Sequence, residues 1–146
     1  MQESEAISIV AAELGVFRWE SDENGRYGAT LMDGSQIRLH TQGGTQLLLE
    51  GELLAEVTPI FSKVDTCLAL LKMNFARSIV DGGILMYVPE YDEIALTQII
   101  ATENCNEDSL ANEVEKFLLA VDQNRKTIQS IIRTSGSMPF TPYGSK

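Results

Sequence analysis

Three turn dipeptides, spaced at intervals of about nine residues, constrain the fold of this chain more than any other feature. They are Asn24-Gly25, Asp33-Gly34 and Gly43-Gly44. Each pair can take the positive φ angles of a tight hairpin. The pieces that they separate, VFRWES, RYGATLM, SQIRLHT and TQLLLEGEL, are rich in residues that favour strands. The spacing therefore predicts an antiparallel meander of three or four strands.

A short helix is predicted before this meander. Its apolar residues recur at helical spacing and are Ile7, Val10, Ala11 and Leu14. Ser4 is the expected N-cap, because its hydroxyl can accept a hydrogen bond from a free N–H of the first turn. Gly15 is expected to end the helix in the left-handed conformation.

A second helix is predicted from Pro59 to Ile79, with Thr58 as its cap. This helix is apolar over most of its circumference, which indicates burial on more than one side. Gly82-Gly83 ends it, and the segments ILMYVPE and DEIALTQIIA predict a second hairpin around residues 89–92.

A long final helix is predicted after Asn106, which is its expected N-cap. The segment from residue 133 onward contains prolines, glycines and hydroxyl residues close together, which favours disorder. We therefore expect one domain over residues 1–132 and a disordered tail over residues 133–146. The predicted fold class is α+β, an α-β-β-β-α-β-β-α sandwich with helices packed on a mainly antiparallel sheet.

The composition excludes several classes of partner. A chain of 146 residues with 44% hydrophobic residues can bury the core of one domain. Its 21 acidic and 11 basic residues give a net charge of −10, which disfavours nucleic acid and anionic membranes as partners. The chain has neither a secretory signal pattern nor a run of about 18 apolar residues, so we expect a cytoplasmic protein without membrane insertion.

The residues that could carry chemistry are few. His40 is the only histidine, and the alternation of QIRLHT places Arg38 and His40 on the outer face of a strand. Cys67 and Cys105 are far apart and are expected to be free thiols. The chain contains neither a phosphate-binding loop nor a nucleophile elbow. We therefore predict no enzyme activity, no cofactor and no metal site.

Two clusters of carboxylates are possible sites. Glu50 and Glu52 share a strand face, and Glu90, Asp92 and Glu93 cluster at the tip of the second hairpin. Paired carboxylates can do acid and base work or bind Ca²⁺. Their spacing fits no known loop, so a solvated hairpin is the favoured interpretation. An enzyme that uses this hairpin tip with His40 is the weakest hypothesis.

Hydrophobic residues are present in surplus on the predicted strands. Residues 84–88 are apolar or aromatic without a break, so the strand shows apolar side chains on both faces of its sheet. If helices cover one face, something else covers the other. One possibility is a helix or the Trp19 segment of the same chain. The other is a second copy of the chain or a captured partner segment, and the sequence leaves both open.

Two long segments carry a resemblance to a known family. LLKMNFARSIVDGGILMYVPEYDEIALTQII runs from an apolar helix through glycines into a hairpin, and NEDSLANEVEKFLLAVDQ forms the last helix. Over residues 3–132, the order of elements resembles the class I chaperones of bacterial type III secretion, the CesT type. The resemblance implies a homodimer in the bacterial cytoplasm that binds the N-terminal region of an effector protein. It also implies delivery of that effector to the secretion ATPase, with no hydrolysis by the chaperone itself.

The resemblance also implies two sets of site residues. The twofold interface would use the second helix and the strand after it, with Leu68, Leu71, Phe75, Leu85 and Tyr87 as candidates. Effector side chains would lie in grooves formed by Val10, Leu14, Phe17, Leu31, Leu47 and Leu48. An effector strand would add to a sheet edge by main-chain hydrogen bonds. The alternative is a bacterial regulatory or small-ligand-binding module of similar fold.

Overall fold

The computed structural model describes residues 1–16, 19–23, 26–57, 68, 71–74 and 83–137. Its elements are α1 (Glu3–Leu14), β1 (Glu20–Ser21), β2 (Tyr27–Thr30), β3 (Gln36–Gln42), β4 (Gln46–Leu54), β5 (Ile84–Val88), β6 (Glu93–Ala101), η1 (Thr102–Asn104) and α3 (Glu107–Ser137). Residues 71–74 are also helical. The rest of the predicted second helix, apart from residue 68, lies outside the described residues.

The strands form one sheet of six, in the order β1-β2-β3-β4-β6-β5, and every neighbouring pair is antiparallel. The predicted α+β class and the predicted meander are therefore confirmed. The second hairpin joins the sheet through its later strand, because β6 pairs with β4 along most of its length. As a result β5 is one edge of the sheet and the two-residue strand β1 is the other.

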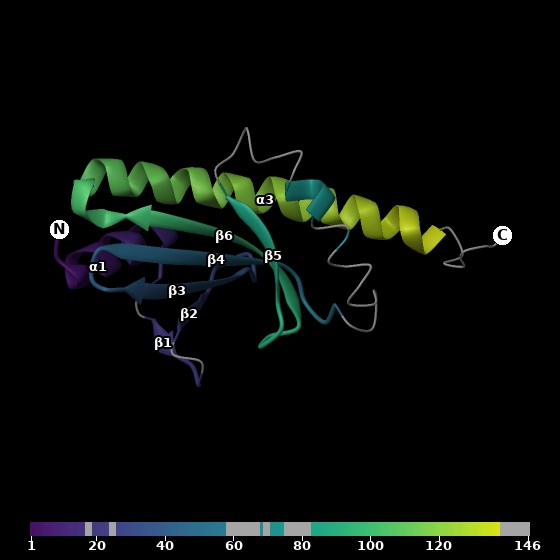
Figure 1. Ribbon diagram of the computed structural model, residues 1–146, viewed down its shortest axis with the longest axis horizontal. Coiled ribbons are helices and arrows are strands. Elements are labelled where there is room, and N and C mark those ends of the chain that lie inside the picture. Colours follow the sequence, from purple (N-terminus) through teal and green to yellow (C-terminus); the bar gives the residue numbers. More distant parts are fainter. Residues whose placement is uncertain (17–18, 24–25, 58–67, 69–70, 75–82, 138–146) are drawn as a thin grey trace.

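Two helices cover one face of this sheet. Figure 1 shows α3 running along the sheet over β6 and β4, with α1 beside the same end. Helix α3 lies close to the sheet at Gly51, where a Cβ atom would lie 2.6 Å from Cγ2 of Val121 and 3.2 Å from Cζ of Phe117. A side chain at this position of β4 would push the helix away. Because Gly51 has no side chain, Val121 and Phe117 of α3 can pack directly against β4.

The expected N-cap of α1 is wrong. The helix begins at Glu3, so Ser4 lies within its first turn, and Gln2 is the N-cap without a side-chain hydrogen bond. The main chain of Gln2 already starts the ladder, because Ala6 N–H donates to its carbonyl oxygen at 3.0 Å. At the other end Gly15 has φ 74° and its N–H donates to carbonyls of the last turn, which confirms it as the terminating residue.

Helix α3 begins as predicted and ends later than predicted. Asn106 Oδ1 accepts from Ser109 N–H at 2.8 Å, and Ser109 Oγ accepts from Asn106 N–H at 2.9 Å. These reciprocal bonds satisfy two N–H groups that a helix start leaves free. The helix continues to Ser137. Residues 133–137, which the serine and glycine content assigned to the disordered tail, are therefore helical. Residues 138–146 lie outside the described residues.

Two of the three predicted hairpin dipeptides are turns with positive φ. Gly34 has φ 90°, and Gly43 and Gly44 have φ 62° and 74°. These angles are open to glycine at no steric cost. The first dipeptide, Asn24-Gly25, lies outside the described residues. Within the described ranges, no helix combines the length and the apolar character needed to cross a membrane.

Candidate functional site

The face of the sheet that α1 and α3 leave uncovered, called here the open face, carries the candidate site. Gly51 touches α3, so its neighbours along β4, Glu50 and Glu52, point to the opposite side. The register places Arg38, Glu50 and Thr97 in one row across this open face. The next row contains His40, Leu48 and Ile99. The open face is thus charged at the end where β6 starts, and its apolar side chains lie in the next row and along β5.

The apolar patch of the open face consists of Leu48, Ile84, Met86 and Ile99. The exposed fractions are 55% for Ile84, 44% for Met86 and 57% for Ile99, and Leu48 is half-buried. Large apolar side chains that gather on one face are typical of a binding surface. Sequence reasoning included Leu48 but missed the other three, although the unbroken apolar run of β5 was the signal.

The charged end of the open face is a buried ion-pair cluster. Arg38 donates from Nη1 to Glu93 Oε1 at 2.7 Å and from Nε to Glu50 Oε1 at 3.2 Å. Arg26 Nε lies 2.8 Å from the same oxygen of Glu50. The exposed fractions are only 6% for Arg38, 3% for Glu50 and 2% for Glu93.

This cluster corrects two predictions. Arg38 points to the outer face as expected, but it is buried there. Glu93 was predicted to be part of a solvated hairpin tip, and the structure buries it against Arg38 instead. The prediction was wrong because the partner of Glu93 lies on β3, which is distant in sequence.

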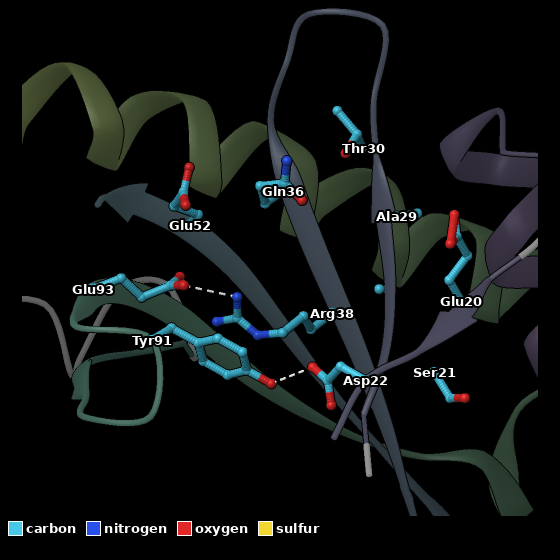
Figure 2. A pocket seen from close by; sticks show the side chains of 11 residues that line it. Glu20, Ser21, Asp22, Ala29, Thr30, Gln36, Arg38, Glu52, Tyr91 and Glu93 are labelled. Carbon is cyan, nitrogen blue, oxygen red and sulfur yellow. Dashed lines mark hydrogen bonds and ion pairs between the residues drawn. The ribbon is translucent and has the colours of Figure 1, made fainter. Parts of the chain in front are cut away.

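Tyr91 covers the cluster. The Arg38 guanidinium lies 3.9 Å from the centroid of the Tyr91 ring, a distance at which the cation is attracted to the aromatic face. The Tyr91 hydroxyl donates a hydrogen bond to Asp22, just after β1 (Figure 2). This hydrogen bond links the turn between β5 and β6 to the end of β1, at the opposite edge of the sheet. The turn therefore covers one end of the open face.

Burial shifts the ionisation of the charged pair. Burial raises the pKa of the Glu93 carboxyl, and the hydrogen bond and charge of Arg38 offset this only in part. For Arg38, burial by itself would lower the pKa, but the bond to Glu93 and the charges of Glu93 and Glu50 outweigh it and raise the pKa. Arg38 therefore stays charged, whereas ionisation of Glu93 has a cost in this environment.

The edge strand β5 is already occupied near its start, at Leu85. Asn74 Nδ2 donates to the carbonyl oxygen of Leu85 at 2.7 Å, and Leu85 N–H donates to Asn74 Oδ1 at 2.7 Å. The amide side chain thus imitates a neighbouring strand. Exposed edge strands invite pairing with another chain. A partner strand could pair with β5 at Leu85 only by displacing Asn74.

The structure separates the predicted interface residues into two groups. Leu68 and Leu71 are exposed, at 53% and 65%, and remain available to a second copy of the chain. Leu85 is only 2% exposed, and Tyr87 is half-buried with its hydroxyl donating to Asp92 at 2.7 Å. Leu85 therefore belongs to the core, because its side chain points to the helix-covered face. Phe75 lies outside the described residues.

The predicted effector-binding residues are separated in the same way. Val10, Leu14 and Leu47 are buried in the core, with exposed fractions of 0%, 8% and 2%. These three side chains belong to the hydrophobic core, and their contact with an effector stays a prediction. Leu31 and Leu48 are half-buried. Phe17 lies outside the described residues.

Other chemistry finds little support in the described part of the chain. Among these residues no group of three histidine, cysteine or acidic side chains could hold a metal ion. Cys105 is a free thiol, and Cys67 lies outside the described residues. His40 is half-exposed on the open face, between the charged cluster and the apolar patch.

Solved structures show which known fold this is. A chain of the ExsC–ExsE complex matches with a TM-score of 0.60 and 14% identity, over 86% of this chain and 96% of that chain. A chain of the HopA1–SchA chaperone–effector complex matches with a TM-score of 0.57 and 16% identity, over 84% of this chain and 92% of that one.

A third match comes from Yersinia pestis. It is the complex of the type III secretion chaperone SycH with a fragment of YscM2, with a TM-score of 0.53, 15% identity, and coverage of 83% of this chain and 98% of that chain. No protein-family model matches the sequence. No curated protein matches it either. The chain therefore has the class I fold of the type III secretion chaperones.

Proposed function

We propose that this protein is a bacterial cytoplasmic chaperone that binds the N-terminal region of a type III secretion effector. It keeps the effector stable and competent for secretion without hydrolysing ATP, and it acts as a homodimer. The fold supports the proposal, because similar chains were solved in a chaperone–effector complex and in a complex of a secretion chaperone with a protein fragment. Delivery to the secretion ATPase belongs to the same proposal.

The apolar patch of the open face is the observation that carries this proposal. Ile84, Met86 and Ile99 are each about half exposed on strands whose other face contributes Leu85, Leu96 and Ile100 to the core. Burying apolar surface stabilises a complex by about 25 cal/mol per Å² before the ordering of the partner is subtracted. A partner segment laid across this face would bury side chains that the chain by itself leaves in water.

The two sheet edges limit how the partner binds. Asn74 occupies the main-chain groups of Leu85 on β5, and β1 is only two residues long. Strand addition, which was expected at an edge, therefore has little free main chain to pair with among the described strands. We propose that the partner contacts the open face mainly through its side chains.

The proposed homodimer uses the exposed leucines near β5. Leu71 lies one helical turn before Asn74, which is bonded to β5. A twofold interface presents the same patch from both copies, so one exposed apolar helix segment suffices. Leu68 and Leu71 therefore remain the interface residues of choice, with Leu85 acting from the core behind them.

Affinity capture tests the proposal most directly. The tagged full-length chain is expressed in its native bacterium, co-purifying proteins are identified, and the bound partner is mapped by limited proteolysis. We expect a secreted protein in about stoichiometric amount, protected near its N-terminus by a dimer of this chain. Recovery of a monomer without a protein partner would contradict the proposal.

A matched pair of variants tests the surface. Ile99→Asp places a charge in the apolar patch and should abolish capture of the partner. Leu119→Asp places the same charge at a site of similar exposure on α3, 60% against 57%, and should leave capture unchanged. Equal capture by both variants would exclude the open face as the binding surface.

The ligand-binding alternative would need a pocket closed by the last helix. The recess that α3 forms with the turn between β2 and β3 is lined by Leu31, Leu118 and Val121 among others, and its volume is about 160 Å³. Small-molecule pockets usually measure roughly 300–1,000 Å³. The recess beneath α3 is therefore smaller than the pocket closed by the last helix that this alternative requires.

A further inference from the structure

An acidic recess lies at the charged end of the open face. Its volume is about 540 Å³, and it lies between the β1–β2 hairpin, β3 and the turn that carries Tyr91. In Figure 2 the carboxylates of Glu52 and Glu93 lie on one side of the Arg38 guanidinium, and those of Glu20 and Asp22 lie on the other. Four carboxyl groups against one guanidinium make the recess negative.

Two buried polar atoms of the recess lack a hydrogen-bond partner among the residues that the structure describes. They are Oε2 of Glu93 and Nη2 of Arg38. Each belongs to a side chain that is more than nine-tenths buried. Buried polar groups are nearly always hydrogen-bonded, and one left unpaired costs about 1–3 kcal/mol. The wall of the recess therefore contains one acceptor and one donor that no described residue pairs.

The charges decide what kind of ligand fits. The charges of Arg26 and Arg38 are balanced by Glu50 and Glu93, so the carboxylates of Glu20 and Glu52 set the sign of the remaining field. An anion would be repelled, although Arg38 Nη2 could donate to it. A guanidinium or ammonium group is attracted and can donate to Glu93. A neutral carbonyl oxygen is suited to Arg38 Nη2.

A basic residue within a polypeptide provides both groups together, a cationic side chain and a main-chain carbonyl. We propose that the acidic recess binds an arginine or lysine side chain of the polypeptide that this protein captures. The inference rests on the proposed function, because the polypeptide is the proposed partner. It adds a position-specific charged contact to the apolar ones.

The recess and the apolar patch are close enough to bind one segment. Arg38 and His40 are two residues apart on β3, and residues at this spacing on the same face of a strand lie about 7 Å apart. The row of His40 contains Leu48 and Ile99, which belong to the apolar patch. A segment that crosses the open face can thus place a basic side chain in the recess and an apolar one on the patch.

The test uses the full-length chain and two small probes. N-acetyl-arginine methylamide has both the cation and the carbonyl groups, and N-acetyl-citrulline methylamide is its neutral isostere. Binding is followed by NMR from the ring protons of Tyr91 and the Nε–H of Arg38. We expect saturable shifts with the arginine probe, shifts at least tenfold weaker with the citrulline probe, and weaker binding at high salt.

Two single substitutions test whether the arginine probe binds in the acidic recess. Glu52→Gln removes one carboxylate of the recess and should weaken the arginine probe about three- to fivefold, the usual range for a partly screened ion pair. Glu115→Gln removes an exposed carboxylate of α3 and should leave the affinity unchanged. Equal binding of both probes, or equal affinity in both variants, would overturn the proposal.

A third probe separates the two sources of a cationic group. Agmatine carries the guanidinium without the amide carbonyls, and it should bind less tightly than the arginine probe. Tighter binding of agmatine would overturn the assignment to a polypeptide. If the arginine probe fails while a secreted partner is still captured, this inference alone fails. If the probe binds at the recess and no partner is captured, the proposed function fails.

Discussion

Arg38 and Glu93 are 55 residues apart in the chain, and Arg38 Nη1 donates to Glu93 Oε1 at 2.7 Å. The bond joins β3 to the start of β6, two strands that are separated in the sheet by β4. Glu50 of β4 accepts from the same guanidinium and completes the connection. The cluster therefore holds three strands together at one end of the open face.

Removing the cation of this cluster should be strongly destabilising. Arg38→Ala leaves Glu50 and Glu93 buried without their common partner, and breaking a buried ion pair in this way costs about 3–5 kcal/mol. The free energy of unfolding from urea denaturation at neutral pH measures the loss. Lys126→Ala is the control, because its pair with Asp122 is exposed and such pairs contribute at most about 1 kcal/mol. Equal losses would show that the cluster is not the source of the stability.

Glu93 should make stability depend on pH above the ordinary glutamate pKa. Its pKa is raised in the folded protein, mainly by burial. Its protonated form therefore stabilises the fold below the ordinary glutamate pKa, and this contribution is lost as pH rises through the folded value. The difference in unfolding free energy between the native chain and Glu93→Gln should shift against the native chain over that range. A difference that does not change with pH would contradict the raised pKa.

Asn74 should protect the edge of the sheet. Asn74→Ala removes both hydrogen bonds to Leu85, and two partly buried bonds together contribute about 1–3 kcal/mol. The amide of Leu85 should then exchange with solvent faster, as measured by hydrogen–deuterium exchange. Asn104→Ala, at an exposed position of η1, provides the comparison. Unchanged exchange at Leu85 would mean that this amide is protected by something other than Asn74.

Gly51 should tolerate no side chain. In Gly51→Ala the new Cβ would lie 2.6 Å from Cγ2 of Val121, and overpacking of this kind costs about 1–3 kcal/mol. Gly28→Ala is a matched control on β2, because its nearest atoms would be 3.8 Å and 3.9 Å away. Chemical denaturation measures the free energy of unfolding of the Gly51→Ala and Gly28→Ala variants. Adding Val121→Ala should recover part of the loss, and a failure to do so would place the strain elsewhere.

Leu71 should control the oligomeric state. Leu71→Glu places a charge on a side chain that is 65% exposed, so the monomer fold is retained while a hydrophobic interface is disrupted. We expect a monomer in sedimentation velocity and loss of the captured partner. Leu119→Glu, at a comparable exposed site, should sediment as the native chain does. A dimer that persists in both Leu68→Glu and Leu71→Glu would exclude the proposed interface.

Local signals predicted the elements well. The turns at Gly34 and at Gly43 and Gly44, and the capping bonds of Asn106, depend on residues within about one turn of each other, so their patterns are visible in the sequence. The predicted N-cap, Ser4, lies two residues after the observed one, because the main chain of Gln2 can start a helix without a side-chain cap.

The sequence by itself determined that this chain is an α+β domain with a meander, a second hairpin and apolar side chains on both faces of β5. Alternation shows which residues share a face, but it does not show which face the helices cover. Only the tertiary structure decided that β6 pairs with β4, that Leu85 is buried while Ile84 and Met86 are exposed, and that Glu93 meets Arg38. Those outcomes depend on contacts between residues far apart in the chain, which no local pattern records.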